Sequence, residues 1–176
     1  MNSKTEDVQE RAIADYSLDG FDRKILGALV ADARQSYAEI GKQVNLSAPA
    51  IHERVKRMKA AGVISRMSAI LDGGAVGKPF LAFVHVDADG WGKSQRMMEL
   101  RAYPEVEEIH SVAGDTCVIL KVRTENAHAL EQFLSQLYIL PGVRGTKSFI
   151  VLSTYMERTV QADVTVNWPS VPLPPE

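Results

Sequence analysis

The clearest chemical signal in the sequence is a run of cations in residues 52–59, HERVKRMK. Around it the apolar residues Ile51, Val55 and Met58 recur at helical spacing, so the charged side chains share the outward side of one helix. Such a helix suits the DNA major groove, which admits a helix and displays a distinct pattern for every base pair. The alternative is a basic helix that is only solvated.

We expect the first half of this helix to meet base edges and its other polar side chains to hold phosphates. The residues expected at base edges are Ala48, Ala50, His52 and Glu53. Those expected at phosphates are Ser47, Arg54, Lys56 and Arg57, with Arg34 and Lys42 holding the DNA backbone from the flanks.

The charge is distributed unevenly along the 176 residues, whose formal net charge is only −2. Residues 18–66 hold nine cations and five anions, a net charge of +4, whereas residues 1–17 carry −2 and residues 67–176 carry −4. A basic segment joined to an acidic one is typical of a DNA-binding module attached to a second domain.

Local signals predict the helices that would present these cations. Asp19 precedes an apolar-periodic stretch that ends near Asp32, and an anion there suits the helix dipole. Ser36 and Glu39 have the spacing of a capping box for a short second helix, which Asn45 ends because it tolerates the left-handed conformation. Two helices joined by a short turn, the second one basic, indicate a helix-turn-helix.

The third helix is bounded by equally clear signals. Ser47 caps it, Pro49 lies in its first turn, and Gly62 stops it. The next residues, 63–71, alternate well enough to form a strand, which predicts a winged variant. We therefore place a winged helix-turn-helix domain at 18–66 and a wing strand with linker at 67–78.

Residues 79–156 alternate between strand and helix patterns, which predicts a ferredoxin-like βαββαβ sandwich and hence an α+β protein. The predicted elements are strands at 79–86, 106–113, 116–123 and 143–152 and helices at 93–102 and 127–137. We expect residues 1–17 to form a tail or flanking helix and the Pro-rich residues 157–176 an extended tail.

The first and third strands are nearly all apolar, which places them at the centre of the sheet. The first strand carries apolar residues on both of its faces, with Ala82 and Val84 on one face and Leu81 and Phe83 on the other. Two helices cover only one face of such a sheet. We therefore expect a homodimer in which a second copy covers the other face.

The turn between the middle strands is the candidate small-molecule site. Gly114 lets a ligand approach backbone N–H groups that hold a carboxylate, and Asp115 is placed to pair with an α-ammonium. The alternative is a plain hairpin turn.

Other classes of function lack their motifs. The single cysteine, Cys117, cannot form an intramolecular disulfide, and the four histidines fall on unrelated elements, so we expect no metal or other cofactor. No nucleophile elbow, Walker loop or GxGxxG is present, which argues against an enzyme. No apolar run approaches the roughly 20 residues of a membrane span, and residues 1–18 do not resemble a signal peptide. We expect a cytoplasmic protein.

From Leu18 to about Met156 the chain resembles the Lrp/AsnC, or feast/famine, family of regulators. The matching stretches are LDGFDRKIL, DARQSYAEIGKQVNLS, RVKRMKAAGVIS, the VG at 76–77, SVAG and LPGV. The resemblance implies a winged helix-turn-helix and a ferredoxin-like effector domain, with dimers that assemble into tetramers or octamers. It also implies control of amino-acid metabolism genes by amino acids bound between dimers near the glycine turn.

One departure from the family concerns the effector site, which we assign to Gly114, Asp115, Thr116 and Cys117. Many members have G-x-x-D here, and the fourth position of this chain is Cys117. The protein then uses Asp115, prefers another ligand or has no amino-acid effector. We expect a sequence-specific transcription regulator; the alternative is an architectural DNA-binding protein that ignores metabolites.

Overall fold

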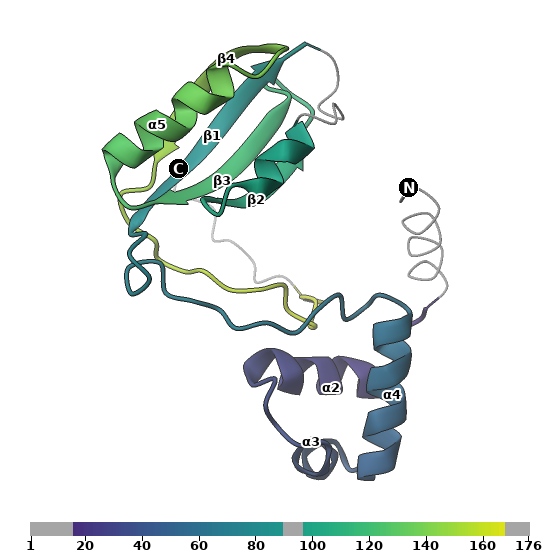
Figure 1. Cartoon of the computed structure of the whole chain (residues 1–176). Helices are drawn as coiled ribbons and strands as arrows, with labels where there is room; N and C mark the ends of the chain where they lie inside the picture. Colours follow the sequence, from purple (N-terminus) through teal and green to yellow (C-terminus); the bar gives the residue numbers. More distant parts are fainter. Residues whose placement is uncertain (1–15, 90–96, 168–176) are drawn as a thin grey trace, which may run out of the picture. The chain divides into compact units, whose positions relative to one another are not determined.

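The computed structural model describes residues 16–89 and 97–167, which divide into two compact units. One unit contains the described residues up to Ser68 and those from Glu157 onward, and the other runs from Ala69 to Met156. The first is helical and the second is built on a sheet (Figure 1). In these described ranges no helix has both the length and the apolarity to cross a membrane.

The helical unit begins its helices at side-chain caps. It contains α2 (Gly20–Ala31), α3 (Tyr37–Val44) and α4 (Ala48–Ala60). The Asp22 N–H donates to the Asp19 carboxylate at 2.8 Å, and the Asp19 N–H donates back to Asp22 at 3.3 Å. Ser36 and Glu39 form the same reciprocal cap on α3. Each cap satisfies N–H groups that a helix start leaves without a partner, so the predicted helix starts are confirmed.

The turn between α3 and α4 depends on a glycine. Asn45 adopts the left-handed conformation at φ 56° and ends α3 as predicted. A Cβ atom on Gly41 would overlap the carbonyl oxygen of Leu46, so the turn packs directly on the glycine backbone. The helices enclose one apolar core, made of Ile25, Leu29, Ile40, Val44, Ile51, Val55 and Met58.

The predicted wing strand was wrong for the described chain. Residues 63–71 form no strand, and the one described sheet takes its four strands from elsewhere. Met67, Ile70 and Leu71 are exposed there. Alternating apolar residues suit a half-buried strand, but a strand also needs a hydrogen-bonding neighbour, and the described chain supplies none.

The second unit is a four-stranded antiparallel sheet with helices, in the strand and helix order that was predicted. Its elements are β1 (Phe80–Ala88), η1 (Met97–Ala102), β2 (Val106–Ser111), β3 (Val118–Thr124), α5 (Ala127–Tyr138) and β4 (Val143–Ile150). The strand order β2-β3-β1-β4 confirms that the first and third strands are central. The predicted helix at 93–102 lies partly outside the described residues, and its described part is the 3₁₀-helix η1.

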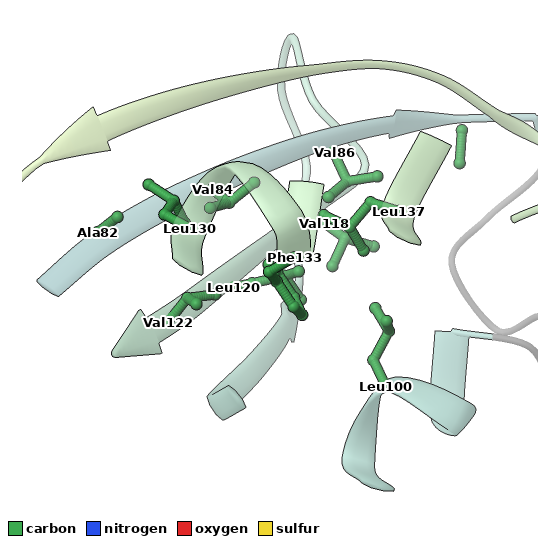
Figure 2. Packing of buried hydrophobic residues seen from close by; sticks show 11 residues of the cluster. Ala82, Val84, Val86, Leu100, Val118, Leu120, Val122, Leu130, Phe133 and Leu137 are labelled. Atoms are coloured by element: carbon green, nitrogen blue, oxygen red, sulfur yellow. The ribbon is translucent and has the colours of Figure 1, made fainter. Parts of the chain in front are cut away.

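One face of this sheet is packed against α5 and η1. Val84 of β1 and Leu120 of β3 are fully buried there, where they meet Phe133 of α5 and Leu100 of η1. Figure 2 shows these side chains between the strands and the helices. Burying apolar area in this way stabilises the unit by about 25 cal/mol per Å² removed from water.

The other face is only partly covered by the described residues. Phe83 of β1 lies directly opposite Phe149 of β4, and these side chains remain 39% and 44% exposed. His85, two residues along β1, has its ring centroid 4.8 Å from that of Phe149. On the β2–β3 half, Lys121 and Glu107 form an ion pair at 3.1 Å. We refer to this side of the sheet as the open face.

The Gly41 contact predicts opposite effects for two glycine substitutions. Gly41→Ala should destabilise the protein by roughly 1–3 kcal/mol, because the new methyl group forces the Leu46 backbone to move. The matched control is Gly27→Ala within α2, where a Cβ meets no atom within 4 Å. The control should stabilise by about 0.5–1 kcal/mol because alanine is the better helix former. Urea unfolding measures both, and equal midpoints would refute the steric argument.

Candidate nucleic-acid interface

The outward face of α4 carries exposed polar and cationic side chains. The exposed members of the predicted set on this helix and its cap are Ser47, His52, Glu53, Lys56 and Arg57. Ala48 and Ala50 are half-buried at the helix start. Because these positions share the first three turns, the structure brings most of the predicted base-edge and phosphate contacts onto one surface.

The two flanking cations lie beside α3. Lys42 is exposed in its last turn. Arg34 precedes the helix and is exposed, although its guanidinium pairs with the Asp32 carboxylate at 3.2 Å. Hydrogen bonding to that carboxylate raises the pKa of Arg34 above its ordinary value. The exposure of both side chains is compatible with contacts to a DNA backbone.

Arg54 is the exception among the predicted phosphate contacts. Its Nη1 atom donates to Asp22 at 2.7 Å and to Asp19 at 2.8 Å, and only 20% of the side chain is exposed. The guanidinium carbon also lies 5.5 Å from the centroid of the Phe21 ring. We therefore assign Arg54 to holding α4 against the start of α2, and we no longer place it at a phosphate.

The carboxylates that hold Arg54 are themselves fixed by hydrogen bonds. Asp22 is 3% exposed and accepts from the Tyr16 hydroxyl at 3.2 Å. The pKa of Tyr16 is raised, mainly by burial and next by the charge of Asp22. The pKa of Asp19 is lowered, mainly by the hydrogen bond from the backbone N–H of Asp22 and next by the hydrogen bond from Arg54. The sequence identified Asp19 only as an anion at the start of a helix.

Tyr37 is a further residue of this surface that the sequence did not single out. It is the first residue of α3, is half-buried, and has its ring centroid 5.7 Å from that of His52. The available signal was a tyrosine directly after the capping Ser36, but spacing alone did not show that it meets α4.

The predicted effector residues lie in the loop between β2 and β3. Gly114, with φ of 153°, and Asp115 are exposed. Thr116 and Cys117 are half-buried and tied to β1, because the Thr116 hydroxyl donates to the Val86 carbonyl at 2.9 Å and the Cys117 thiol donates to the Ala88 carbonyl at 3.4 Å. The four residues therefore divide into an exposed tip and an anchored base.

Arg144 is a charged neighbour of this loop that the sequence did not assign to the site. Its Nη2 atom donates to the Asp87 carboxylate at 2.9 Å, and that hydrogen bond raises the pKa of Arg144. The Cys117 Sγ atom lies 3.8 Å from the same carboxylate. The base of the loop thus adjoins a cation on β4.

A compact unit of helices in which α4 presents exposed cations defines a helix-turn-helix DNA-binding protein. Models of two domain families match the chain: the AsnC-type helix-turn-helix domain at residues 18–59 and the Lrp/AsnC ligand binding domain at residues 81–161. The chain is 37% identical over 142 residues to the HTH-type transcriptional regulator FL11 of Pyrococcus horikoshii, covering 81% of this chain and 94% of that protein.

Solved structures agree with this assignment. E. coli AsnC matches with a TM-score of 0.75 at 28% identity, covering 82% of this chain and 99% of AsnC. The L-Met complex of a transcriptional regulator from Neisseria meningitidis matches with a TM-score of 0.73 at 27% identity, covering 81% and 95%. The chain belongs to the Lrp/AsnC family of DNA-binding transcription regulators.

The position of Arg54 predicts that it and Lys56 act differently. Lys56→Ala should reduce the salt dependence of DNA binding by about one phosphate contact and leave stability unchanged. Arg54→Ala should instead destabilise by about 2 kcal/mol, because it leaves Asp22 buried beside an empty position. Fluorescence anisotropy against salt and urea unfolding separate the two effects. If Arg54→Ala instead reduced the salt dependence of DNA binding and left stability unchanged, Arg54 would contact a phosphate as the sequence predicted.

The lowered pKa values at the caps predict acid sensitivity of the helical unit. The backbone N–H of Ser36 lowers the pKa of Glu39 below its usual 4.5, as the Asp22 N–H does for Asp19 below 3.8. A lowered folded-state pKa adds stability above the usual value, and that stability is lost as pH falls through the folded value. Asp19→Asn keeps the cap but cannot titrate, so its unfolding midpoint should fall less on acidification. Parallel pH profiles would contradict this.

Proposed function

We propose that this protein is a homodimeric, sequence-specific transcription regulator whose DNA binding responds to an amino acid. The observation that carries the proposal is the outward face of α4, where Lys56 and Arg57 are exposed beside His52. In a helix-turn-helix this face enters the major groove. The cations hold phosphates, while His52 and Glu53 contact base edges.

Dimerisation through the open face gives the protein two helical units and therefore more contacts with DNA than one unit makes. A module of net charge +4 makes few phosphate contacts and releases few counterions, so its affinity for DNA is modest on its own. Two copies joined by a symmetric interface place two recognition helices on half-sites a fixed distance apart. The exposed Phe83 and Phe149 support this use of the sheet, because partly exposed aromatic residues gain from burial against a second copy.

The loop between β2 and β3 is the proposed effector site. Exposed backbone at Gly114 receives the ligand carboxylate and Asp115 its ammonium group. The match to a ligand-binding domain model and the L-Met complex of the Neisseria relative support an amino acid as the ligand class. Further assembly of dimers would bring loops of neighbouring copies together.

An architectural DNA-binding protein without an effector is the second candidate. It is favoured by the anchored base of the loop, where Thr116 and Cys117 already bond to carbonyl oxygens of β1. Neither side chain then has a hydrogen to donate to a ligand without rearrangement.

Substitution on the open face tests the dimer. Phe83→Asp places a charge in the proposed interface, where an unpaired carboxylate is costly, so we expect monomers in sedimentation velocity. The matched control is Ile139→Asp, since Ile139 is an exposed apolar residue just after α5. It should remain dimeric. A folded Phe83→Asp protein that sediments as the unaltered chain does would refute this interface.

Calorimetry with each standard amino acid tests the effector. One or a few should bind, and Asp115→Asn should weaken that binding roughly tenfold because an ammonium–carboxylate contact is lost. Absence of heat and of any change in assembly across the whole set would favour the architectural protein.

A further inference from the structure

We propose that Tyr37 is a specificity-determining residue: its ring positions His52, so that the pair rather than His52 alone sets which base the regulator prefers. The inference rests on the proposed docking of α4 in the major groove, with His52 at a base edge. It adds a residue of α3 to the recognition surface.

The geometry of the two rings carries the proposal. Their centroids are 5.7 Å apart and their planes are inclined by 41°, a tilted aromatic contact. Tyr37 is half-buried, whereas the side chain of His52 is 58% exposed. Tyr37 is thus the fixed partner of the pair, and one side of the imidazole remains open to a ligand.

The backbone beneath Tyr37 is held in place. Tyr37 follows Ser36, whose side chain and Glu39 form the capping box of α3. The ring also packs against the apolar core of the helical unit. A ring held this way lies in the same place whether or not DNA is bound.

His52 has few other constraints. It occupies the second turn of α4, and its Nδ1 atom lies 3.7 Å from Oε1 of the neighbouring Glu53. An exposed side chain loses rotamer freedom when it binds, and a neighbour that restricts it beforehand reduces that cost. The direction of the imidazole also decides which ring nitrogen faces a base, and base edges are distinguished by the direction of their donors and acceptors.

Two substitutions of Tyr37 separate positioning from a direct phosphate contact. Tyr37→Phe keeps the ring beside His52 and removes the hydroxyl, whereas Tyr37→Leu removes the aromatic contact. If Tyr37 acts through His52, the phenylalanine variant keeps the base preference of the unaltered protein. If the hydroxyl instead binds a phosphate, the phenylalanine variant binds every sequence more weakly and with a smaller salt slope.

The experiment selects the duplexes that each protein binds from a random-sequence DNA library. The proteins compared are the unaltered full chain, Tyr37→Phe, Tyr37→Leu, His52→Ala and the Tyr37→Leu/His52→Ala double variant. His52→Ala should relax preference at one base pair by roughly tenfold. Tyr37→Leu should relax the same base pair, and the double variant should show no further loss. Urea unfolding accompanies each selection, since a merely structural role would change stability without changing preference.

Tyr138→Leu is the matched control, because it removes an exposed tyrosine from the other unit and should change neither preference nor salt dependence. The proposal is overturned if Tyr37→Leu keeps the base preference that His52→Ala loses, or if the two losses add. It is also overturned if His52→Ala changes no preference. In those cases a salt slope reduced by Lys56→Ala still supports the docking of α4, whereas loss of that effect refutes the docking itself.

Discussion

The position of α4 depends on an ion-pair cluster at the start of α2, in which Asp22 is buried and Arg54 is mostly buried. The guanidinium of Arg54 on α4 meets the carboxylates of Asp19 and Asp22. Charges removed from water are stable only when their hydrogen bonds are made. Asp22 meets that requirement with Arg54, the Tyr16 hydroxyl and a backbone N–H. With Arg54 engaged in this way, Lys56 and Arg57 remain exposed for the proposed contacts with DNA.

The sheet of the second unit imposes a different constraint. β1 carries apolar side chains on both faces, and α5 and η1 pack on only one of them. The open face is divided: the β2–β3 half is covered by ion pairs such as that of Lys121 with Glu107, and the β1–β4 half exposes Phe83 and Phe149. The proposed self-complementary interface would use both halves, because apolar contact gives affinity and charge fixes the register.

Features that depend on neighbouring residues could be predicted from the sequence, whereas features that depend on distant residues could not. The start of α3 followed from Ser36 and its end from Asn45, because both residues act within three or four positions of themselves. The central place of β1 and β3 followed from their continuous apolar runs. The wing strand did not follow from its alternation, because a strand is defined by its neighbour as much as by its own side chains. The ligand and the oligomer stay predictions.

The sequence by itself determined the caps, the helical stripe of α4, the basic character of its outward face and the order of strands and helices, because each depends on residues close together in the chain. Only the tertiary structure decided that Arg54 turns inward to an aspartate 32 residues away, and that Tyr37 of α3 lies against His52 of α4. Contacts of that kind depend on how helices pack, and packing leaves no fixed spacing in a sequence.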